Sequence, residues 1–334
     1  MTSVPYSVAP CGIAPHGVAA HDIAAHGIAA HGIAAPEAAQ TLKGVTHVYT
    51  DLDGTLFAPG GRLLAAHDGS PSVATAQALV ALKDAGIEVI IVTGRSLAQG
   101  TEIMRILHLN TFIGELGCMI QEGYGATARV SYALGDWEHT VLADGLAPGE
   151  LPPNTSPAEL IQASGIIERL IGVFPGKLEP HNPYQDTRKV TLMLRGNIDC
   201  KQAERILEGG TLPLQLLDNG IIHPQEHTLV DCSEVHIYHI MPKGAGKGFA
   251  VGADMSRRGL SREQTVAVGD AIGDMTMGEY TGSFVLVNNG DMGKIIENYR
   301  GGKLFTTQGL TADGWAEFAR ALLAALPNRT QRTQ

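Results

Sequence analysis

Val48-Tyr49-Thr50-Asp51-Leu52-Asp53-Gly54-Thr55-Leu56 joins an apolar run to a pair of acids. The β-branched and aromatic residues at positions 48–50 predict a buried strand. Asp51 and Asp53 follow at its carboxyl end, and Gly54 permits a sharp change of direction. Neighbouring carboxylates are costly to bury without a cation or a proton, and ligands of open α/β sheets bind at the carboxyl ends of strands. The segment therefore favours a metal-assisted active site, and it leaves open the alternative of an acidic turn after an ordinary strand.

Alternating strand and helix signals follow this segment. Ser70-Pro71 is a plausible helix start, Gly86 a stop, and residues 87–92 form a nearly continuous β-branched run. Thr93 and Gly94 come next, before a helical pattern over residues 97–107. Such alternation with short links predicts an α/β fold with a doubly wound parallel sheet. A hydroxyl and a glycine N–H at a strand end make a natural oxyanion cradle, although such turns are also common without function.

Near the C-terminus, two more strand–helix units carry charged residues at their junctions. A glycine-rich stretch at 244–248 lacks the P-loop spacing, and Lys247 instead begins a helix that runs to about Arg258. Because a lysine at a helix N-terminus opposes the helix dipole, its position suggests that it pairs with an anion. The buried strand predicted at 265–268 runs into Asp270 and Asp274, which together with the first acid pair offer the hard oxygen ligands that Mg²⁺ prefers.

The middle of the chain has a different pattern of predicted elements. Prolines gather at 152–157, and helical and strand patterns then occur without further parallel strand–helix units: a helix over 158–173, a strand over 189–194 and a hairpin over 214–222. We predict an inserted α+β cap domain over 124–236, between the two halves of a core at 44–123 and 237–327. Arg188 is the substrate-contact candidate here, because a cap over an anionic substrate needs a group that recognises an anion.

The N-terminal segment is a low-complexity repeat. Residues 9–35 repeat with a period of five, and His16, His21, His26 and His31 recur with it. Five residues turn an α-helix by about 500°, so successive histidines share no face, which weakens a metal-binding interpretation. We therefore expect a disordered tail over 1–43 without a catalytic role, and a second tail over 328–334.

Composition restricts the partners and the compartment. The formal net charge of −10 argues against a nucleic-acid partner. No apolar stretch approaches the roughly 18 residues of a membrane helix, so no membrane partner is expected. Four widely spaced cysteines form neither a metal-binding spacing nor a disulfide scaffold, and the absence of a secretory signal pattern favours the cytoplasm.

Along the chain, these strand ends carry a carboxylate pair, Thr-Gly, a lysine and a second carboxylate pair. This order resembles the four signature motifs of the haloacid dehalogenase superfamily of phosphohydrolases. The resemblance spans residues 44–327. The insert lies between the second motif and the lysine, and Phe112–Ile120 and Asp313-Gly314 also resemble the Cof-type branch, whose neighbours include mannosyl-3-phosphoglycerate and sucrose-phosphate phosphatases.

The resemblance implies a role for each motif residue. Asp51 is expected to form an aspartyl-phosphate, and Asp53 to protonate the leaving alcohol and then activate water. Thr93, the Gly94 N–H and Lys247 are expected to hold the phosphoryl oxygens, with Lys243 as the second choice of lysine. The expected Mg²⁺ ligands are Asp51, the Asp53 carbonyl and Asp270, with Asp274 as a further ligand or an orienting group.

Two positions depart from the Cof pattern. Gly273 and Leu116 occupy positions where the branch usually has asparagine. The expected activity is Mg²⁺-dependent hydrolysis of a small phosphorylated metabolite, such as a sugar phosphate. A phosphotransferase or phosphomutase using the same intermediate, or a non-catalytic member, remains as an alternative.

Overall fold

The computed structural model describes residues 30–138, 155–183, 187–224, 226–290 and 292–327. Its contacts divide the chain into two compact units. Among the described residues, the larger unit comprises 30–94, 103–130 and 246–327, and the smaller unit comprises 95–102 and residues within 131–245. We describe each unit by itself.

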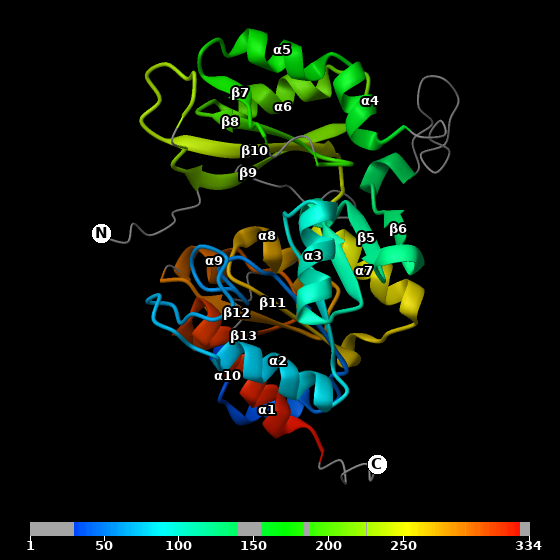
Figure 1. The fold of residues 1–334 in the computed structure, drawn as a ribbon, viewed down its shortest axis with the longest axis vertical. Coiled ribbons are helices and arrows are strands. Elements are labelled where there is room, and N and C mark those ends of the chain that lie inside the picture. Colours follow the sequence, from blue (N-terminus) through cyan, green and yellow to red (C-terminus); the bar gives the residue numbers. More distant parts are fainter. Residues whose placement is uncertain (1–29, 139–154, 184–186, 225, 291, 328–334) are drawn as a thin grey trace, which may run out of the picture. The chain divides into compact units, whose positions relative to one another are not determined.

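The larger unit contains a nine-stranded sheet in the order β1-β13-β12-β11-β2-β3-β4-β5-β6 (Figure 1). The pairs from β1 to β4 are parallel, and β5 is antiparallel to β4. The strands are β1 (Ala30–Gly32), β2 (His47–Thr50), β3 (Glu88–Val92), β4 (Thr111–Gly114), β5 (Met119–Glu122), β6 (Arg129–Tyr132), β11 (Thr265–Gly269), β12 (Ser283–Asn288) and β13 (Lys303–Leu310). The predicted doubly wound parallel sheet is confirmed.

Helices cover both faces of this sheet. They are α1 (Pro36–Leu42), α2 (Ala74–Asp84), α3 (Leu97–Leu107), α7 (Lys247–Arg258), α8 (Ile272–Met275), α9 (Gly293–Asn298) and α10 (Thr311–Ala325). Successive residues of a strand point to opposite faces. Val48 belongs to the core that includes Leu79 of α2, whereas the hydroxyl of Tyr49 donates to Asp254 of α7. Helices α2 and α7 therefore lie on opposite faces.

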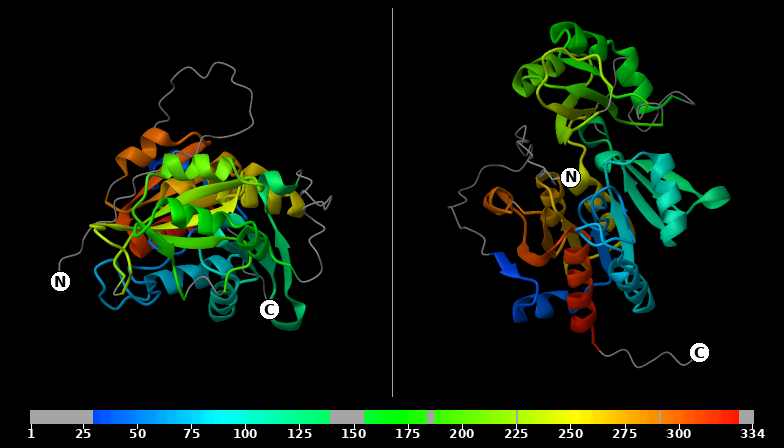
Figure 2. Two further views of the ribbon diagram at one scale, coloured as in Figure 1. Left: turned by 90° about the horizontal axis from the view of Figure 1, so that it is seen from above. Right: turned by 60° about the vertical axis from the view of Figure 1, so that its left-hand side comes forward.

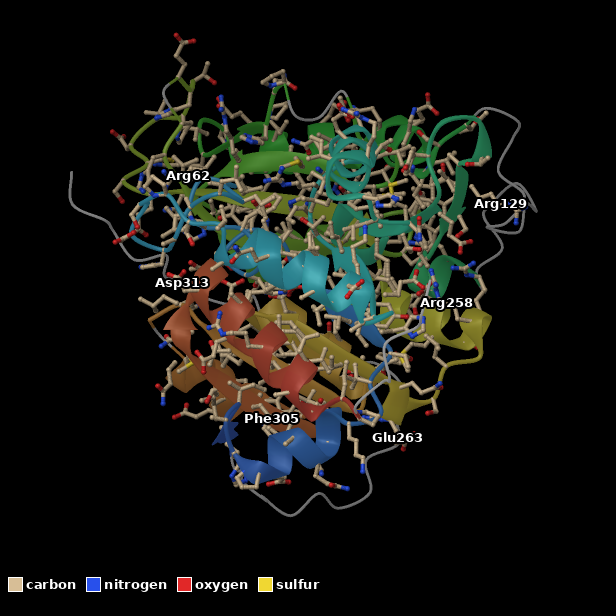
Figure 3. The ribbon with its side chains drawn as sticks, turned by 60° about the horizontal axis from the view of Figure 1, so that its bottom comes forward. Arg62, Arg129, Arg258, Glu263, Phe305 and Asp313 are labelled. Carbon is tan, nitrogen blue, oxygen red and sulfur yellow. The ribbon has the colours of Figure 1, made fainter. Side chains whose placement is uncertain are left out.

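The main core lies between the sheet and the α2–α10 face. Helix α10 packs on α2 and on α1, and Figure 3 shows α2 and α10 side by side across the sheet. Trp315, Phe318 and Leu322 of α10 are fully buried, and Leu326 packs at the edge of this core. Side chains of β2, β3 and β11 belong to this core, which positions the two acidic loops and the Thr93-Gly94 turn that follow these strands.

The end of the N-terminal segment is ordered, contrary to the expectation of a disordered tail to residue 43. Strand β1, which contains His31, pairs in parallel with β13. Helix α1 begins at Pro36, and its Ala38 and Leu42 are fully buried in the main core. The five-residue repeat stops at 35, where proline and apolar side chains at helical spacing take over. His16, His21 and His26 lie outside the described residues.

A buried ionic network fixes the C-terminal half of α7. Asp254 is fully buried and accepts hydrogen bonds from Tyr49 (2.8 Å), Arg257 (2.6 Å) and Arg258 (2.8 Å). Arg258 also pairs with Glu88 of β3 at 3.0 Å. The network ties α7 to two neighbouring strands, and Lys247 is the first residue of the same helix.

Replacing Asp254 by Ala is expected to destabilise the fold by about 3 kcal/mol, because it leaves buried donors and a partly buried guanidinium without their shared acceptor. Urea unfolding of the full chain measures this free energy. Glu122→Ala is the matched control: it removes a partly exposed partner of Arg257 and should cost less than about 1 kcal/mol. Equal losses for the two variants would contradict the assignment.

The smaller unit contains an antiparallel sheet in the order β7-β8-β10-β9. Helices α4, α5 and α6 lie on one face of it (Figure 2). The elements are α4 (Pro157–Ala163), α5 (Ile166–Val173), β7 (Leu178–Pro180), β8 (Leu192–Gly196), α6 (Cys200–Glu208), β9 (Leu214–Ile222) and β10 (Val235–Pro242). All of them fall between β6 and β11 in the chain, so the sheet is an insertion, as predicted. The predicted limits of the insert, 124–236, stay a prediction.

Three local predictions in this unit are wrong. The helix expected over 158–173 is broken at Gly165, whose φ of 72° lies in the left-handed region. The hairpin expected at 214–222 is one continuous strand, β9. The residues expected to form its turn make a bulge instead, because the pairing of β9 with β10 shifts register between His236 and Tyr238 of β10. Within the bulge, the Asp218 carboxylate accepts a hydrogen bond from the Gly220 N–H. Residues 237–242, which fall in the predicted second half of the core, belong instead to β10, an inner strand of this sheet.

Short 3₁₀ turns complete the described structure: η1 (Glu115–Gly117), η2 (Gly125–Thr127), η3 (Gly135–Glu138), η4 (Arg262–Gln264) and η5 (Thr276–Glu279). Among the residues that the structure describes, no helix combines the length and the hydropathy needed to cross a membrane.

Candidate active site

The site lies at the carboxyl ends of adjacent parallel strands of the larger unit. Strand β2 lies between β11 and β3, so the residues that follow these strands, Asp51, Asp270 and Thr93, are at the same edge of the sheet. The N–H of Asp51 donates to the Val268 carbonyl at 2.8 Å, which extends the β2–β11 pairing up to the acid. Asp51 is only 6% exposed.

Lys247 links the two acidic loops. Its Nζ lies 2.6 Å from Oδ1 of Asp51 and 2.6 Å from Oδ1 of Asp274. Helix α7 begins at this lysine, which has Gly244 and Gly246 before it and Gly248 directly after it. The prediction that a lysine at this helix start pairs with an anion is thus met by two carboxylates of the chain itself.

The second acidic loop is held by its own hydrogen bonds. Oδ2 of Asp274 accepts from the N–H groups of Asp270 (3.1 Å) and Ala271 (3.0 Å), which closes the loop into α8. Oδ1 of Asp270 accepts from the Thr55 hydroxyl at 2.6 Å, and the Asp270 carbonyl accepts from the Asn289 amide at 2.7 Å. Asp274 is therefore anchored by the backbone, whereas Asp270 is oriented from the first acidic loop.

Gly54 allows the two acidic loops to approach each other. Its φ is +87°, a conformation that favours glycine, and a Cβ at this position would lie 2.8 Å from Oδ2 of Asp270. Any side chain here would both strain the backbone and press on a site carboxylate. The Asp-x-Asp-Gly order thus has a steric reason in the fold.

Negative charge outweighs positive charge in the site. Burial and the charge of Asp274 raise the pKa of Asp270 to about 7, although the hydrogen bond from Thr55 acts to lower it. Burial also raises the pKa of Asp51 well above its usual value, although Lys247 pulls it down. Burial acts to lower the pKa of Lys247, but Asp274 and Asp51 outweigh it and hold the pKa above its usual value. One ammonium is shared by three carboxylates, which leaves an excess negative charge.

The same three carboxylates fit a metal ion. One oxygen each of Asp51, Asp270 and Asp274 can be chosen so that all lie within 4.8 Å of one another. Carboxylate oxygens suit Mg²⁺, and a divalent cation would offset the excess charge that raises the pKa of Asp270. The donor set therefore supports the predicted metal site, and the identity of the metal stays a prediction.

The remaining predicted residues occupy different positions. Thr93 is 2% exposed, and its N–H donates to the Ile113 carbonyl at 2.9 Å, so its position after β3 is fixed by strand pairing. Gly94 follows it at the same sheet edge. The side chain of Asp53 is exposed and does not belong to the three-carboxylate cluster. Lys243, the second choice of lysine, belongs to the smaller unit, which favours Lys247.

Arg188 belongs to the smaller unit and is buried. Its Nε donates to the Thr191 hydroxyl at 2.6 Å, and its Nη2 lies 3.5 Å from Nδ1 of His239. A role in substrate contact stays a prediction.

Sequence reasoning missed Thr55 and Asn289. Thr55 lies within the first acidic motif, but only the fold shows that its hydroxyl orients Asp270. Asn289 follows strand β12, and the rule that polar residues at strand ends gather at one sheet edge applies to it as well as to Asp270.

The departures from the Cof pattern have structural counterparts. A Cβ at Gly273 would meet nothing within 4 Å, so the position has room for the usual side chain. Leu116 has a φ of 61°, in the region that asparagine adopts more readily than leucine. Neither residue is among the three carboxylates, and neither departure removes one of their contacts.

Comparison with known proteins decides the family. A sequence model described as haloacid dehalogenase-like hydrolase matches residues 48–131 and 221–295, which include Asp51, Thr93, Lys247 and Asp270. Over these two segments the chain is similar to the haloacid dehalogenase-like hydrolases. This confirms the predicted family and the expectation of an enzyme.

Proteins that are similar to this chain include phosphatases. It is 25% identical over 242 residues, 72% of this chain and 82% of the relative, to a phosphoglycolate phosphatase of Methanoculleus marisnigri. The sucrose-phosphatase of Synechocystis sp. PCC6803 is structurally similar, with a TM-score of 0.54 and 15% identity over 84% of this chain and 98% of that chain. A sugar phosphatase of subclass IIB gives a TM-score of 0.50 and 14% identity over 83% and 98%. These structural likenesses confirm the fold, including the inserted domain.

Proposed function

We propose that the chain is a Mg²⁺-dependent phosphomonoester hydrolase of small phosphorylated metabolites that acts through an aspartyl-phosphate. The observation that carries the proposal is the contact of Lys247 with both Asp51 and Asp274, with Asp270 in the same carboxylate cluster. A carboxylate nucleophile beside an ammonium group and a metal-binding acid set suits phosphoryl transfer.

In the proposed reaction, a carboxylate oxygen of Asp51 attacks phosphorus while the bond to the leaving alcohol breaks. Asp53, whose side chain is exposed, gives its proton to that alcohol and then takes a proton from the attacking water. The water oxygen displaces the Asp51 carboxylate and releases phosphate. Lys247, Thr93 and the Gly94 N–H stabilise the phosphoryl oxygens during both steps.

Asp51, Asp270 and Asp274 would hold the metal, together with the Asp53 carbonyl. Bound Mg²⁺ supplies positive charge that offsets the carboxylates and the phosphoryl oxygens. Charge compensation matters for Asp51 in particular, because its raised pKa favours the protonated form, which is not a nucleophile. The chain's own lysine supplies one positive charge, which the three acids share.

The proposal predicts Mg²⁺-dependent release of p-nitrophenol from p-nitrophenyl phosphate, with metal affinity that falls in acid. Because the pKa of Asp270 is raised to about 7 without metal, protons compete with Mg²⁺ below that pH. The Mg²⁺ concentration for half-maximal activity should therefore be about tenfold higher at pH 6 than at pH 8. Initial rates over a Mg²⁺ series at the two pH values measure it.

EDTA should remove the activity and added Mg²⁺ should restore it. Full hydrolysis after EDTA treatment would contradict the metal-dependent function. A half-activating Mg²⁺ concentration that does not depend on pH would contradict the assignment of Asp270 as a ligand. A phosphomutase would instead retain the phosphate on a product isomer, which phosphorus NMR of the reaction mixture detects.

A further inference from the structure

The first turn of α7, which begins with Lys247, is capped by a residue from another element. The first N–H groups of a helix have no partner inside the helix, and a side chain at the N-cap position usually accepts from one of them. Here the N-cap residue is Gly246, which has no side chain that could accept. The N–H of Gly248 instead donates to the hydroxyl of Thr276 at 3.1 Å. The start of α7 therefore depends on Thr276 for its cap.

Thr276 lies just after the second acidic loop. It is the first residue of η5 and comes two positions after Asp274. Its hydroxyl donates to the Gly273 carbonyl at 2.9 Å, so the hydroxyl hydrogen is used within this segment and the oxygen accepts from Gly248. One hydroxyl thus joins the start of α7 to the turn that carries Asp270 and Asp274.

This hydrogen bond needs a close approach of two backbones. Gly248 and Gly252 lie one helical turn apart on the face of α7 that packs on η5 and on Tyr280 after it. A Cβ at Gly248 would lie 2.4 Å from the Thr276 carbonyl oxygen, and a Cβ at Gly252 would lie 2.3 Å from a carbon of the Tyr280 ring. The absence of side chains here lets the Gly248 N–H reach the Thr276 hydroxyl.

The Thr276 link runs beside the ionic contact of Lys247. Nζ of Lys247 lies 2.6 Å from Oδ1 of Asp274, and the next residue of the helix, Gly248, is bonded to Thr276. In the proposed reaction the ammonium also stabilises phosphoryl oxygens, which compete with the carboxylates for its N–H groups. The Thr276 link does not involve the ammonium, so that competition leaves it intact. It can therefore hold the backbone of Lys247 in place throughout the reaction.

We propose that Thr276 is a positioning residue for Lys247, and that its hydroxyl fixes the start of α7 relative to the second acidic loop. The expected effect on catalysis rests on the proposed function. The expected effect on the lysine itself rests only on the hydrogen bonds of Thr276. The two effects are measured separately.

Thr276→Val keeps the shape of the side chain and removes both hydrogen bonds, so it should lower kcat for p-nitrophenyl phosphate in saturating Mg²⁺ about tenfold through misplacement of Lys247. Thr276→Ser keeps the hydroxyl and should retain most of the wild-type kcat. Thr281→Val is the matched control. The buried Thr281 hydroxyl bonds to the carbonyls of Met277 and Ser283, which lie outside α7, so its loss should leave kcat unchanged.

A double-mutant cycle tests whether Thr276 acts through the lysine. In a Lys247→Met background, Thr276→Val should lower kcat no further, because the group that Thr276 positions is already absent. A second loss of about tenfold in that background would overturn the proposal. Wild-type kcat in the single variant Thr276→Val would overturn it as well.

The placement of Lys247 is measured in the metal-free protein without substrate. Competitive acetylation followed by mass spectrometry gives the reaction rate of the Lys247 amine, which is slow while two carboxylates hold it as an ammonium ion. The rate should rise at least about fivefold in Thr276→Val, because the lysine moves away from these partners. It should stay at the wild-type value in Thr276→Ser and Thr281→Val.

An unchanged acetylation rate in Thr276→Val overturns the proposal. If wild-type protein with Mg²⁺ does not hydrolyse p-nitrophenyl phosphate, the proposed function fails. The acetylation rates alone then decide whether Thr276 positions Lys247.

Discussion

Asp51→Asn is expected to lower kcat for p-nitrophenyl phosphate by at least about 1,000-fold, because an amide cannot form the aspartyl-phosphate. The same change should not damage the fold. Asn has the shape of Asp, and Lys247 keeps its contact with Asp274 at 2.6 Å. Burial raises the pKa of Asp51, so the negative charge at this position is unfavourable in the metal-free protein. Removing that charge should stabilise the metal-free protein by about 1 kcal/mol.

Loss of activity with a gain in stability distinguishes a nucleophile from a structural acid. Steady-state kinetics in saturating Mg²⁺ and thermal unfolding in EDTA measure the two effects. Asp68→Asn is the control, since Asp68 is an exposed acid of the same connection between β2 and α2 and should change neither quantity. Retention of most of the metal-dependent activity by Asp51→Asn would refute the proposed nucleophile.

The core of the site could be predicted from the sequence because a parallel sheet aligns its strand ends. Buried β-branched runs identify β2, β3 and β11, and each run stops at a polar residue at the carboxyl end of its strand. Neighbouring strand ends must then meet, which brings Asp51 and Asp270 together although 219 positions separate them. The orientation of the side chains could not be predicted in this way. The hydrogen bond from the Thr55 hydroxyl to Asp270, for example, depends on the path of the turn at Gly54.

The smaller unit was harder to predict because its signals are local and ambiguous. Asp218-Asn219-Gly220 has the composition of a hairpin turn, but pairing along the whole of β10 makes it a bulge inside one strand. The contact of Arg188 with His239 joins residues 51 positions apart, on neighbouring segments of an antiparallel sheet. No periodicity along the chain encodes that register. Long-range pairing therefore decided both features.

Lys247→Met is expected to reduce kcat/KM for p-nitrophenyl phosphate by about 100- to 1,000-fold, the usual cost of removing one donor to a charged transition state. The structure adds a second consequence. Lys247 is the ammonium that contacts Asp51 and Asp274, so its loss leaves their carboxylates with more unbalanced charge and raises the pKa of Asp51 further. Protons should then compete with Mg²⁺ more strongly, so the half-activating Mg²⁺ concentration near pH 7 should be higher for the variant than for the wild type.

Lys243→Met is the matched control, because Lys243 is four residues earlier in the same glycine-rich stretch and belongs to the smaller unit. It should retain wild-type kcat/KM within about threefold and the wild-type Mg²⁺ dependence. Lys247→Arg tests the charge separately from the position of the donor. The guanidinium keeps the positive charge, so the half-activating Mg²⁺ concentration should stay near the wild-type value. Its planar group cannot make two 2.6 Å contacts from one nitrogen, so kcat should remain low. A Lys243 variant with the larger kinetic defect would reverse the assignment of the lysine.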